Sequence, residues 1–246
     1  MKRGNIWLAV ISHARPMNVP KMTKLIGVAT WYIGDGDDEA RLYELTGAHI
    51  VRAGGLITAR NRALDDAFAA GCDCLQLSDD LRSFGVTFRD PSGVLRRRKS
   101  TLGYTASTLQ RALDTTGFYL AGGAPVTRPS ENYFAPEFGT HSFILGDAML
   151  IRATDLRFDE RLPLKEDYDY TAQHFQRYGG VARAGRLVPD FEHRTNFGGA
   201  VDARSSAREQ EAIAILREKW GSWITRNPRS PDEIRLRLPT ATTALE

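Results

Sequence analysis

Segments with strand and helix character alternate along the first 80 residues, and this alternation constrains the fold more than any other feature of the sequence. Short apolar runs predict four buried strands, at Ile6–Ile11, Val28–Ile33, His49–Arg52 and Cys72–Ser78. Helix-start signals stand between these runs, at Asn18, at Asp37-Asp38-Glu39 and at Thr58. Because a βαβαβαβ order produces parallel strands with helices on both faces, we predict an α/β fold with a mostly parallel central sheet flanked by helices.

Polar residues follow three of these predicted strands. They are Ser12–Arg15, Asp35 and Asp79-Asp80. In a parallel sheet, ligands bind beyond the carboxyl ends of the strands, where the strand order reverses. Adjacent carboxylates such as Asp79 and Asp80 suit magnesium or manganese, and such an ion can neutralise a diphosphate leaving group. An Asp pair after a strand is also a common helix cap or turn, so both interpretations stay open.

The pattern becomes less regular after residue 84. We expect strands at Phe84–Phe88, His141–Arg152 and Val181–Val188, and helices at Thr105–Asp114, at Glu166–Tyr178 and from Ser206 to Gly221. Residues 90–103 are expected to form a basic loop, and residues 121–140, rich in Gly and Pro, a loop over a site. We expect one domain over residues 1–225, with halves 1–80 and 81–225, and a partly disordered tail over 226–246.

Positive charge is concentrated in one segment. The chain carries a net charge of +3, but residues 82–111 hold seven basic residues and one acid, Asp90. The basic residues are Arg82, Arg89, Arg96, Arg97, Arg98, Lys99 and Arg111. A basic patch attracts phosphates, either of a small nucleotide or of a nucleic acid. A solvated loop without a ligand is the other interpretation.

Neither the cysteines nor the apolar runs indicate secretion or membrane insertion. Cys72 and Cys74 stand one residue apart, and we interpret them as buried thiols in a reducing cytoplasm. No run of 18 apolar residues predicts a membrane span, and the run at Ile6–Ile11 lacks a signal-peptide cleavage site. We therefore expect a cytoplasmic protein.

Two linked motifs carry a family resemblance. The helix segment Gly55…Ala59-Arg60-Asn61 is followed by the strand ending Leu77-Ser78-Asp79-Asp80. Together they resemble the inverting glycosyltransferases with the A-type (GT-A) fold. The resemblance implies a nucleotide sugar such as UDP-glucose as donor, and Mn²⁺ or Mg²⁺ held by Asp79 and Asp80. The chain departs from the family pattern at Leu77, where the family carries the first acid of its metal triplet.

A third motif matches the same family. Phe158-Asp159-Glu160 precedes Lys165-Glu166-Asp167-Tyr168-Asp169. By resemblance, Asp167 is the base that deprotonates the acceptor hydroxyl, with Glu166 beside it. Acids at a helix start also have a structural interpretation, since they complement the helix dipole.

Other site residues follow from the resemblance by their order along the chain. His193 would be a third metal ligand, although a lone His is also commonly structural. The family binds the nucleotide sugar at positions matched by Ser12, Arg15, Trp31, Asp35 and Asp79, and Arg60 would meet the diphosphate.

The whole order of motifs is similar to that of the TET/JBP-dioxygenase-associated glycosyltransferases of tailed bacteriophages. That resemblance implies transfer of the sugar to 5-hydroxymethylcytosine in DNA, in the cytoplasm of a bacterial host. The Arg96–Lys99 run, with Tyr104 and Tyr133-Phe134 as stacking groups, would suit a DNA acceptor. A glycan or small-molecule acceptor, a nucleotidyltransferase and a non-catalytic DNA-binding module remain as alternatives.

Overall fold

A nine-stranded sheet forms the centre of the protein. The computed structural model describes residues 2–3, 5–125, 129–134, 136–192, 206–227 and 230–239. Within these residues the sheet runs in the order β4 (His49–Arg52), β3 (Thr30–Ile33), β2 (Ile6–Ile11), β5 (Asp73–Ser78), β10 (Ala148–Ile151), β8 (Leu120–Gly123), β11 (Ala182–Ala184) and β9 (Phe138–Gly139), and β1 (Lys2–Arg3) also pairs with β2.

The first half of the sheet is parallel, as predicted. Strands β4, β3, β2 and β5 run in one direction, while β10 is antiparallel to both β5 and β8. The chain builds outward from β2 to β4 and then returns to place β5 on the other side of β2. The strand order therefore reverses between β2 and β5, which is where such folds bind ligands.

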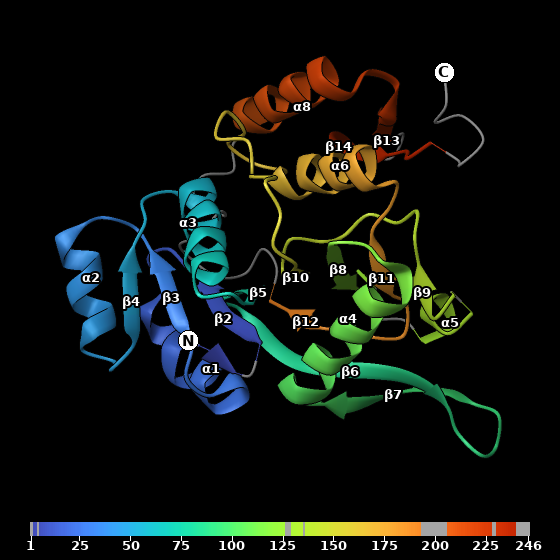
Figure 1. Ribbon diagram of the computed structural model, residues 1–246, viewed down its shortest axis with the longest axis horizontal. Helices are drawn as coiled ribbons and strands as arrows, with labels where there is room; N and C mark the ends of the chain where they lie inside the picture. The colour runs from blue at the N-terminus through green and yellow to red at the C-terminus, as the bar shows by residue number, and fades with distance from the viewer. Residues whose placement is uncertain are drawn as a thin grey trace.

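Helices cover both faces of the sheet (Figure 1). The helices of the described residues are α1 (Val19–Ile26), α2 (Asp37–Glu44), α3 (Leu56–Ala69), α4 (Leu102–Thr116), α5 (Pro129–Asn132), α6 (Glu166–Tyr178) and α8 (Ser206–Trp220), which packs with the strands Ile224–Asn227 and Ser230–Leu236, and there are 3-10 turns at η1 (Pro16–Asn18) and η2 (Gly221–Trp223). Buried residues of α1, α2 and α4 form one core with the sheet, and those of α3 and α6 form a second core on the opposite face. The predicted α/β architecture is confirmed, and it is compatible with a Rossmann-like fold.

Two smaller sheets correct the sequence-based expectations. Residues 90–103 do not form a loop, because β7 (Leu95–Ser100) pairs with β6 (Leu81–Arg89) in a hairpin that β12 (Asp190–Phe191) extends. The tail is ordered over part of its length, since β14 (Ser230–Leu236) pairs with β13 (Ile224–Asn227). Both segments become strands by pairing with the strand that precedes them in the chain, which their own polarity does not indicate.

Other expected elements are shorter than predicted. Of His141–Arg152 only β10 is a strand, and of Val181–Val188 only β11. Residues 121–140 contain the end of β8, the short helix α5 and strand β9. Of the helices that the structure describes, none combines the length and the apolar character needed to cross a bilayer.

Helix α4 begins with a side-chain cap, which gives a prediction for its stability. The Thr101 hydroxyl accepts a hydrogen bond of 3.2 Å from the amide of Tyr104. Thr101→Ala leaves that amide without its partner, so we expect the free energy of unfolding to fall by about 1 kcal/mol. Chemical denaturation of both proteins measures this, and Thr101→Ser should restore most of the loss. Equal midpoints for Thr101→Ala and the parent would contradict the cap.

Candidate active site

A cavity of about 270 Å³ opens at the point where the strand order reverses. It lies beyond the carboxyl ends of β2 and β5 and beside the start of α3. Its lining residues are Ile11, Ser12, His13, Arg15, Gly54, Gly55, Leu56, Ala59, Ser78, Asp79, Pro163, Leu164 and Arg208. Three residues predicted to bind nucleotide, Ser12, Arg15 and Asp79, meet here.

The carboxylate of Asp79 organises the floor of this cavity. Oδ2 accepts a hydrogen bond of 2.5 Å from the Ser12 hydroxyl, and Oδ1 accepts one of 2.9 Å from Arg15 Nη1. The Tyr43 hydroxyl completes the network, at 2.5 Å from Ser12 Oγ and 3.0 Å from the Arg15 amide. Burial raises the pKa of Asp79 to about 6, although Ser12 and Arg15 act against this shift.

Asp79 and Asp80, the predicted metal ligands, do not form a metal site by themselves. Asp80 Oδ2 lies 3.9 Å from Arg15 Nη1, so the guanidinium stands between the two adjacent carboxylates. Within the described ranges, no three His, Cys, Asp or Glu side chains converge as a metal would need. His193, the predicted third ligand, lies outside the described residues. The two aspartates therefore need a further donor before they suit Mn²⁺ or Mg²⁺.

Leu77 stands where the sequence resemblance would place an acid, and its surroundings do not suit one. Its side chain is fully buried in the same core cluster as Leu75. Side chains alternate along β5, so Gln76 points to the opposite face, toward Arg60. A carboxylate at position 77 would lie in the hydrophobic core without a partner, which is energetically costly.

Arg60 is a buried bridge between three elements. Nε donates to Glu166 Oε1 of α6 at 3.0 Å, Nη1 to Gln76 of β5 at 3.1 Å, and Nη2 to the carbonyl of Gly146 at 3.0 Å. Its guanidinium is directed into the protein and does not line the cavity. The structure thus places Arg60 and Glu166 in a supporting network, where the sequence had suggested a diphosphate contact and a catalytic neighbour.

Asp167 lies at the start of α6, next to that network. One carboxylate oxygen accepts a hydrogen bond of 3.1 Å from the Gly146 amide, and the other accepts one of 3.0 Å from the Tyr168 amide. Burial raises the pKa of Asp167 to about 7, with a further increase from the charge of Glu166. A carboxyl group that titrates near neutral pH can both accept and release a proton there, as a general base requires.

Backbone contacts connect Asp167 to the cavity. The Ser78 amide donates to the Asp147 carbonyl at 2.8 Å, and Gly146, the next residue back, binds both Arg60 and Asp167. A Cβ atom on Gly146 would stand 2.9 Å from Arg60 Nη2 and 3.3 Å from Asp167 Cβ. Glycine at this position therefore allows the close approach that places Asp167 beside the end of β5.

Two residues with strained backbone flank the site. Ala14, after β2, has φ of 55°, and Lys165, immediately before α6, has φ of 61°. Side chains other than glycine rarely adopt such angles, and they concentrate at functional sites. The Ala14 amide is held by Glu39 at 2.8 Å, and the Lys165 ammonium contacts Glu209 of α8 at 2.5 Å. Both contacts help to hold the unfavourable conformations.

The remaining predicted residues lie elsewhere. Trp31 is buried in the core against Tyr43, with ring centroids 6.0 Å apart, and Asp35 is exposed; neither lines the cavity. Sequence reasoning missed Tyr43, Gly146 and Arg208. The buried side chains of α2 are Ala40 and Tyr43, whereas Leu42 and, directly after the helix, Leu45 are exposed, and no sequence signal singled out the three missed residues for the site.

The raised pKa of Asp167 predicts a pH-dependent stability. In the folded protein the Asp167 carboxyl group stays protonated up to about pH 7, whereas in the unfolded chain it loses its proton near pH 3.8. Stability from this group is therefore lost as the pH rises from about 4 to 7. Asp167→Asn removes the ionisation, so we expect the variant to be more stable than the parent at pH 8, by on the order of 4 kcal/mol, and similar at pH 4. Thermal melts at both pH values measure this; a lower melting temperature at pH 8 would contradict it.

The comparisons with known proteins add no family. No protein-family model and no curated protein matches the chain.

Proposed function

We propose that the protein is a glycosyltransferase that binds a nucleotide sugar, such as UDP-glucose, in the cavity at the ends of β2 and β5. The observation that carries this proposal is a cavity at the reversal of strand order with Asp79 on its floor and Asp167 beside it. Arg15 and Arg208 line the same cavity and offer positive charge to a diphosphate. The family resemblance of the Ala59-Arg60-Asn61 and Lys165–Asp169 motifs supports the same assignment.

Asp167 is the proposed base of an inverting transfer. The acceptor oxygen attacks the anomeric carbon of the sugar while the acceptor proton passes to the Asp167 carboxylate. The bond from that carbon to the diphosphate oxygen breaks, and the nucleoside diphosphate leaves with the electron pair. Arg60 and Glu166 act one contact further away, since they fix the Gly146 carbonyl and the start of α6 on either side of Asp167.

A divalent cation is a separate part of the proposal. Mn²⁺ or Mg²⁺ at Asp79 and Asp80, completed by His193, would neutralise the leaving diphosphate. Because Arg15 already lies beside both carboxylates, the protein itself supplies part of the positive charge at this position. Loss of transfer in EDTA, with recovery on added Mn²⁺, is the expected result.

The proposed acceptor is the hydroxyl of 5-hydroxymethylcytosine in DNA, on the strength of the phage-family resemblance and the basic segment 82–111. A glycan or small molecule is the alternative acceptor. A non-catalytic DNA-binding module is the alternative function, and buried Leu77, in place of a metal-binding acid, is the observation that favours it.

One experiment separates these cases. The protein is incubated with Mn²⁺, UDP-glucose and DNA containing 5-hydroxymethylcytosine. The DNA is then digested to nucleosides, and their masses are measured by mass spectrometry. We expect a gain of one hexose, retained in the exposed control Asp38→Asn and lost in Asp80→Ala. UDP release without a mass gain would keep the glycosyltransferase and rule out this DNA base as its acceptor. Neither transfer nor release across a panel of nucleotide sugars, with DNA still bound, would favour the non-catalytic module.

A further inference from the structure

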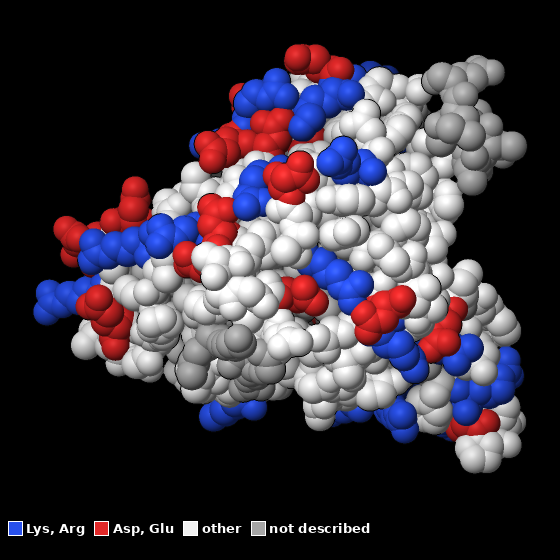
Figure 2. Space-filling view, viewed as in Figure 1, with Lys and Arg blue, Asp and Glu red and all other residues white. Residues whose placement is uncertain are grey.

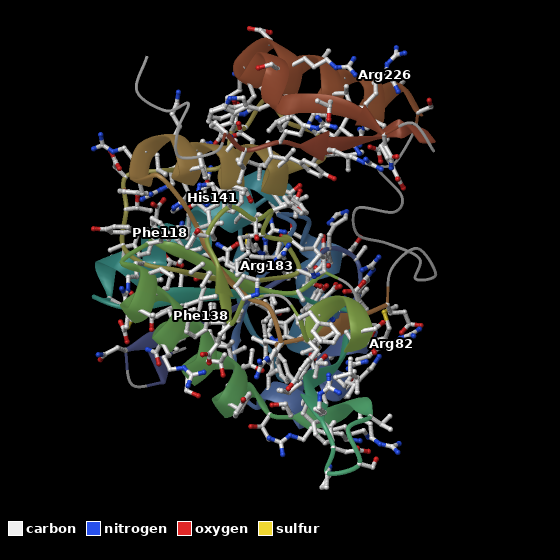
Figure 3. The ribbon with its side chains drawn as sticks, turned by 90° about the vertical axis from the view of Figure 1, so that its right-hand side faces the viewer. Arg82, Phe118, Phe138, His141, Arg183 and Arg226 are labelled. Carbon is white, nitrogen blue, oxygen red and sulfur yellow. The ribbon has the colours of Figure 1, made fainter. Side chains whose placement is uncertain are left out.

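A second cavity, of about 340 Å³, lies between the β6–β7 hairpin, α4 and β11, apart from the lining of the first. Arginines and aromatic rings dominate its walls. They are Arg89, Arg98, Arg111, Arg186, Phe88, Tyr104, Tyr133 and Phe138. We refer to it as the arginine cleft. Phe138, labelled in Figure 3, enters it from β9 at the edge of the large sheet.

Pairing reduces the positive charge of segment 82–111 and leaves it concentrated at this cleft. Arg82, Arg96, Arg97 and Arg111 form ion pairs with Glu192, Asp90, Asp190 and Glu137. Figure 2 shows acidic groups among the basic ones over the hairpin, at the lower right. Arg89, Arg98 and Arg186 line the cleft and form no ion pair with any carboxylate in the described ranges.

The cleft arginines stand over aromatic rings. The guanidinium carbons of Arg186 and Arg89 lie 4.7 and 5.2 Å from the centroid of the Tyr133 ring, and that of Arg98 lies 5.6 Å from the Phe88 ring. Arg89 also donates to the Gly93 carbonyl at 2.6 Å, which fixes its orientation. Guanidinium groups bind phosphate in two-pronged contacts, and aromatic faces stack with bases.

The wall of the cleft also holds an unsatisfied polar group. The Thr87 side chain is 1% exposed, and its hydroxyl has no hydrogen-bond partner among the described residues. Thr87 lines the cleft together with Arg89 and Arg98. A buried hydroxyl without a partner is costly, so a ligand that hydrogen-bonds there would gain affinity. Unpaired cations, stacking rings and this hydroxyl together match the chemistry of a nucleotide.

Strand β6 connects the arginine cleft to the candidate active site. It begins at Leu81, directly after Asp80, and the cleft residues Val86–Arg89 form its far end. At roughly 3.3 Å per residue, the far end lies about 20–30 Å along the strand from Asp80. That is the length of about six to nine nucleotides at the rise of a stacked strand, and of fewer nucleotides in an unstacked strand. The cleft can therefore hold one part of a polynucleotide while another of its nucleotides reacts at the candidate active site.

We propose that the arginine cleft binds an unstacked segment of a nucleic-acid strand, with Arg89, Arg98 and Arg186 on phosphates and Tyr133 and Tyr104 against bases. This inference rests on the proposed nucleic-acid acceptor and adds where that acceptor is held. An acidic peptide or a sulfated polymer would satisfy the arginines but not the rings. A free nucleotide would leave some of the exposed arginines without a phosphate.

The test measures binding of a labelled single-stranded DNA of about 12 nucleotides by fluorescence anisotropy, without any sugar donor. We expect Arg98→Ala/Arg186→Ala to weaken binding at least about tenfold, and to reduce the slope of log affinity against log salt by about 1.4, or 0.7 per lost contact. An abasic strand of equal charge should bind the parent at least about fivefold more weakly, because it cannot stack.

Lys99→Ala is the matched control. Lys99 is an exposed cation next to Arg98 on β7, and it is not among the residues that line the cleft. It should bind like the parent. Equal affinity of the double variant and the parent, equal loss in Lys99→Ala, equal binding of the abasic strand, or full competition by a mononucleotide would each overturn the inference.

The same variant keeps the two proposals distinguishable. Arg98→Ala/Arg186→Ala leaves the donor cavity intact, so any slow release of nucleotide from the nucleotide sugar to water should match the parent. Strand binding without sugar chemistry would retain the arginine cleft and remove the glycosyltransferase. Sugar transfer by the parent, with equal strand binding by the parent and the double variant, would retain the glycosyltransferase and remove the arginine cleft. Unchanged melting temperatures confirm that the variant is folded.

Discussion

Arg60→Ala should lower the free energy of unfolding by about 3–5 kcal/mol, the largest loss of stability that we expect from one surface-distant substitution. The change leaves the buried Glu166 carboxylate without its cation, and it removes the donors to Gln76 Oε1 and to the Gly146 carbonyl. Because one kcal/mol corresponds to about 2–4 °C in a chain of this size, the melting temperature should fall by roughly 6–20 °C. Calorimetry or a thermal melt followed by circular dichroism measures it.

Arg62→Ala is the matched control for this prediction. Arg62 lies on the same helix, two residues away, and its side chain is 56% exposed in an ion pair with Asp66. Exposed pairs contribute little, so its melting temperature should stay within about 2 °C of the parent. If Arg60→Ala and Arg62→Ala have the same melting temperature, the Arg60 network does not hold α6 to β5. Replacing both Arg60 and Glu166 by methionine should recover part of the loss, since no buried charge then remains unpaired.

The contrast between these two arginines shows where sequence reasoning ended. Both stand in the Ala59-Arg60-Asn61-Arg62 run, and their side chains differ only in which face of α3 they occupy. The partner of Arg60 is Glu166, 106 residues further along the chain, and nothing local specifies that pairing. The motif singled out Arg60 as a diphosphate contact and gave Arg62 no role, but only the fold shows that Arg60 supports the candidate site from within and does not line the cavity.

Local patterns were sufficient for the first half of the fold. Buried strands such as Ile6–Ile11 and helices with one apolar face carry their own periodicity, and so their order and parallel pairing followed. Strand β7, whose sequence is Leu-Arg-Arg-Arg-Lys-Ser, has little apolar character and reads as a loop. It is a strand because β6 offers it hydrogen bonds in register from Phe84 to Arg89. The arginine cleft likewise depends on pairing and packing between elements, since its walls come from the β6–β7 hairpin, α4 and β11.

The candidate site was predicted in a similar, incomplete way. Ser12, Arg15 and Asp79 were expected at the ends of strands, and they meet in the cavity. Their hydrogen bonds were not predictable, because they depend on Tyr43 of α2, which reaches Ser12 and the Arg15 amide. Ionic and hydrogen-bonded contacts of this kind are set by packing between elements, and a sequence pattern describes one element at a time.

Asp167→Asn should reduce the rate of sugar transfer by about 10²–10⁴-fold while nucleotide affinity stays close to that of the parent. The substitution retains an oxygen that can accept from the Gly146 amide, so the start of α6 keeps its position. It removes the group that takes the acceptor proton. Asp167 does not line the cavity that we assign to the nucleotide, which is why binding should persist. Steady-state transfer and nucleotide titration, on the same preparations, measure the two effects separately.

The pH profile distinguishes a base from a merely structural acid at this position. With a pKa near 7, Asp167 is protonated and inactive at low pH, so the parent's kcat/KM should rise about tenfold per pH unit below 7 and level off above it. The residual activity of Asp167→Asn should lose that rise. Asp167→Glu keeps the carboxyl group and should retain a titration, at reduced rate, because the longer side chain displaces the oxygen. If the rise survives unchanged in Asp167→Asn, the titration belongs to another group. Asp79 is then the first candidate, because it is also a carboxyl group with a raised pKa, of about 6.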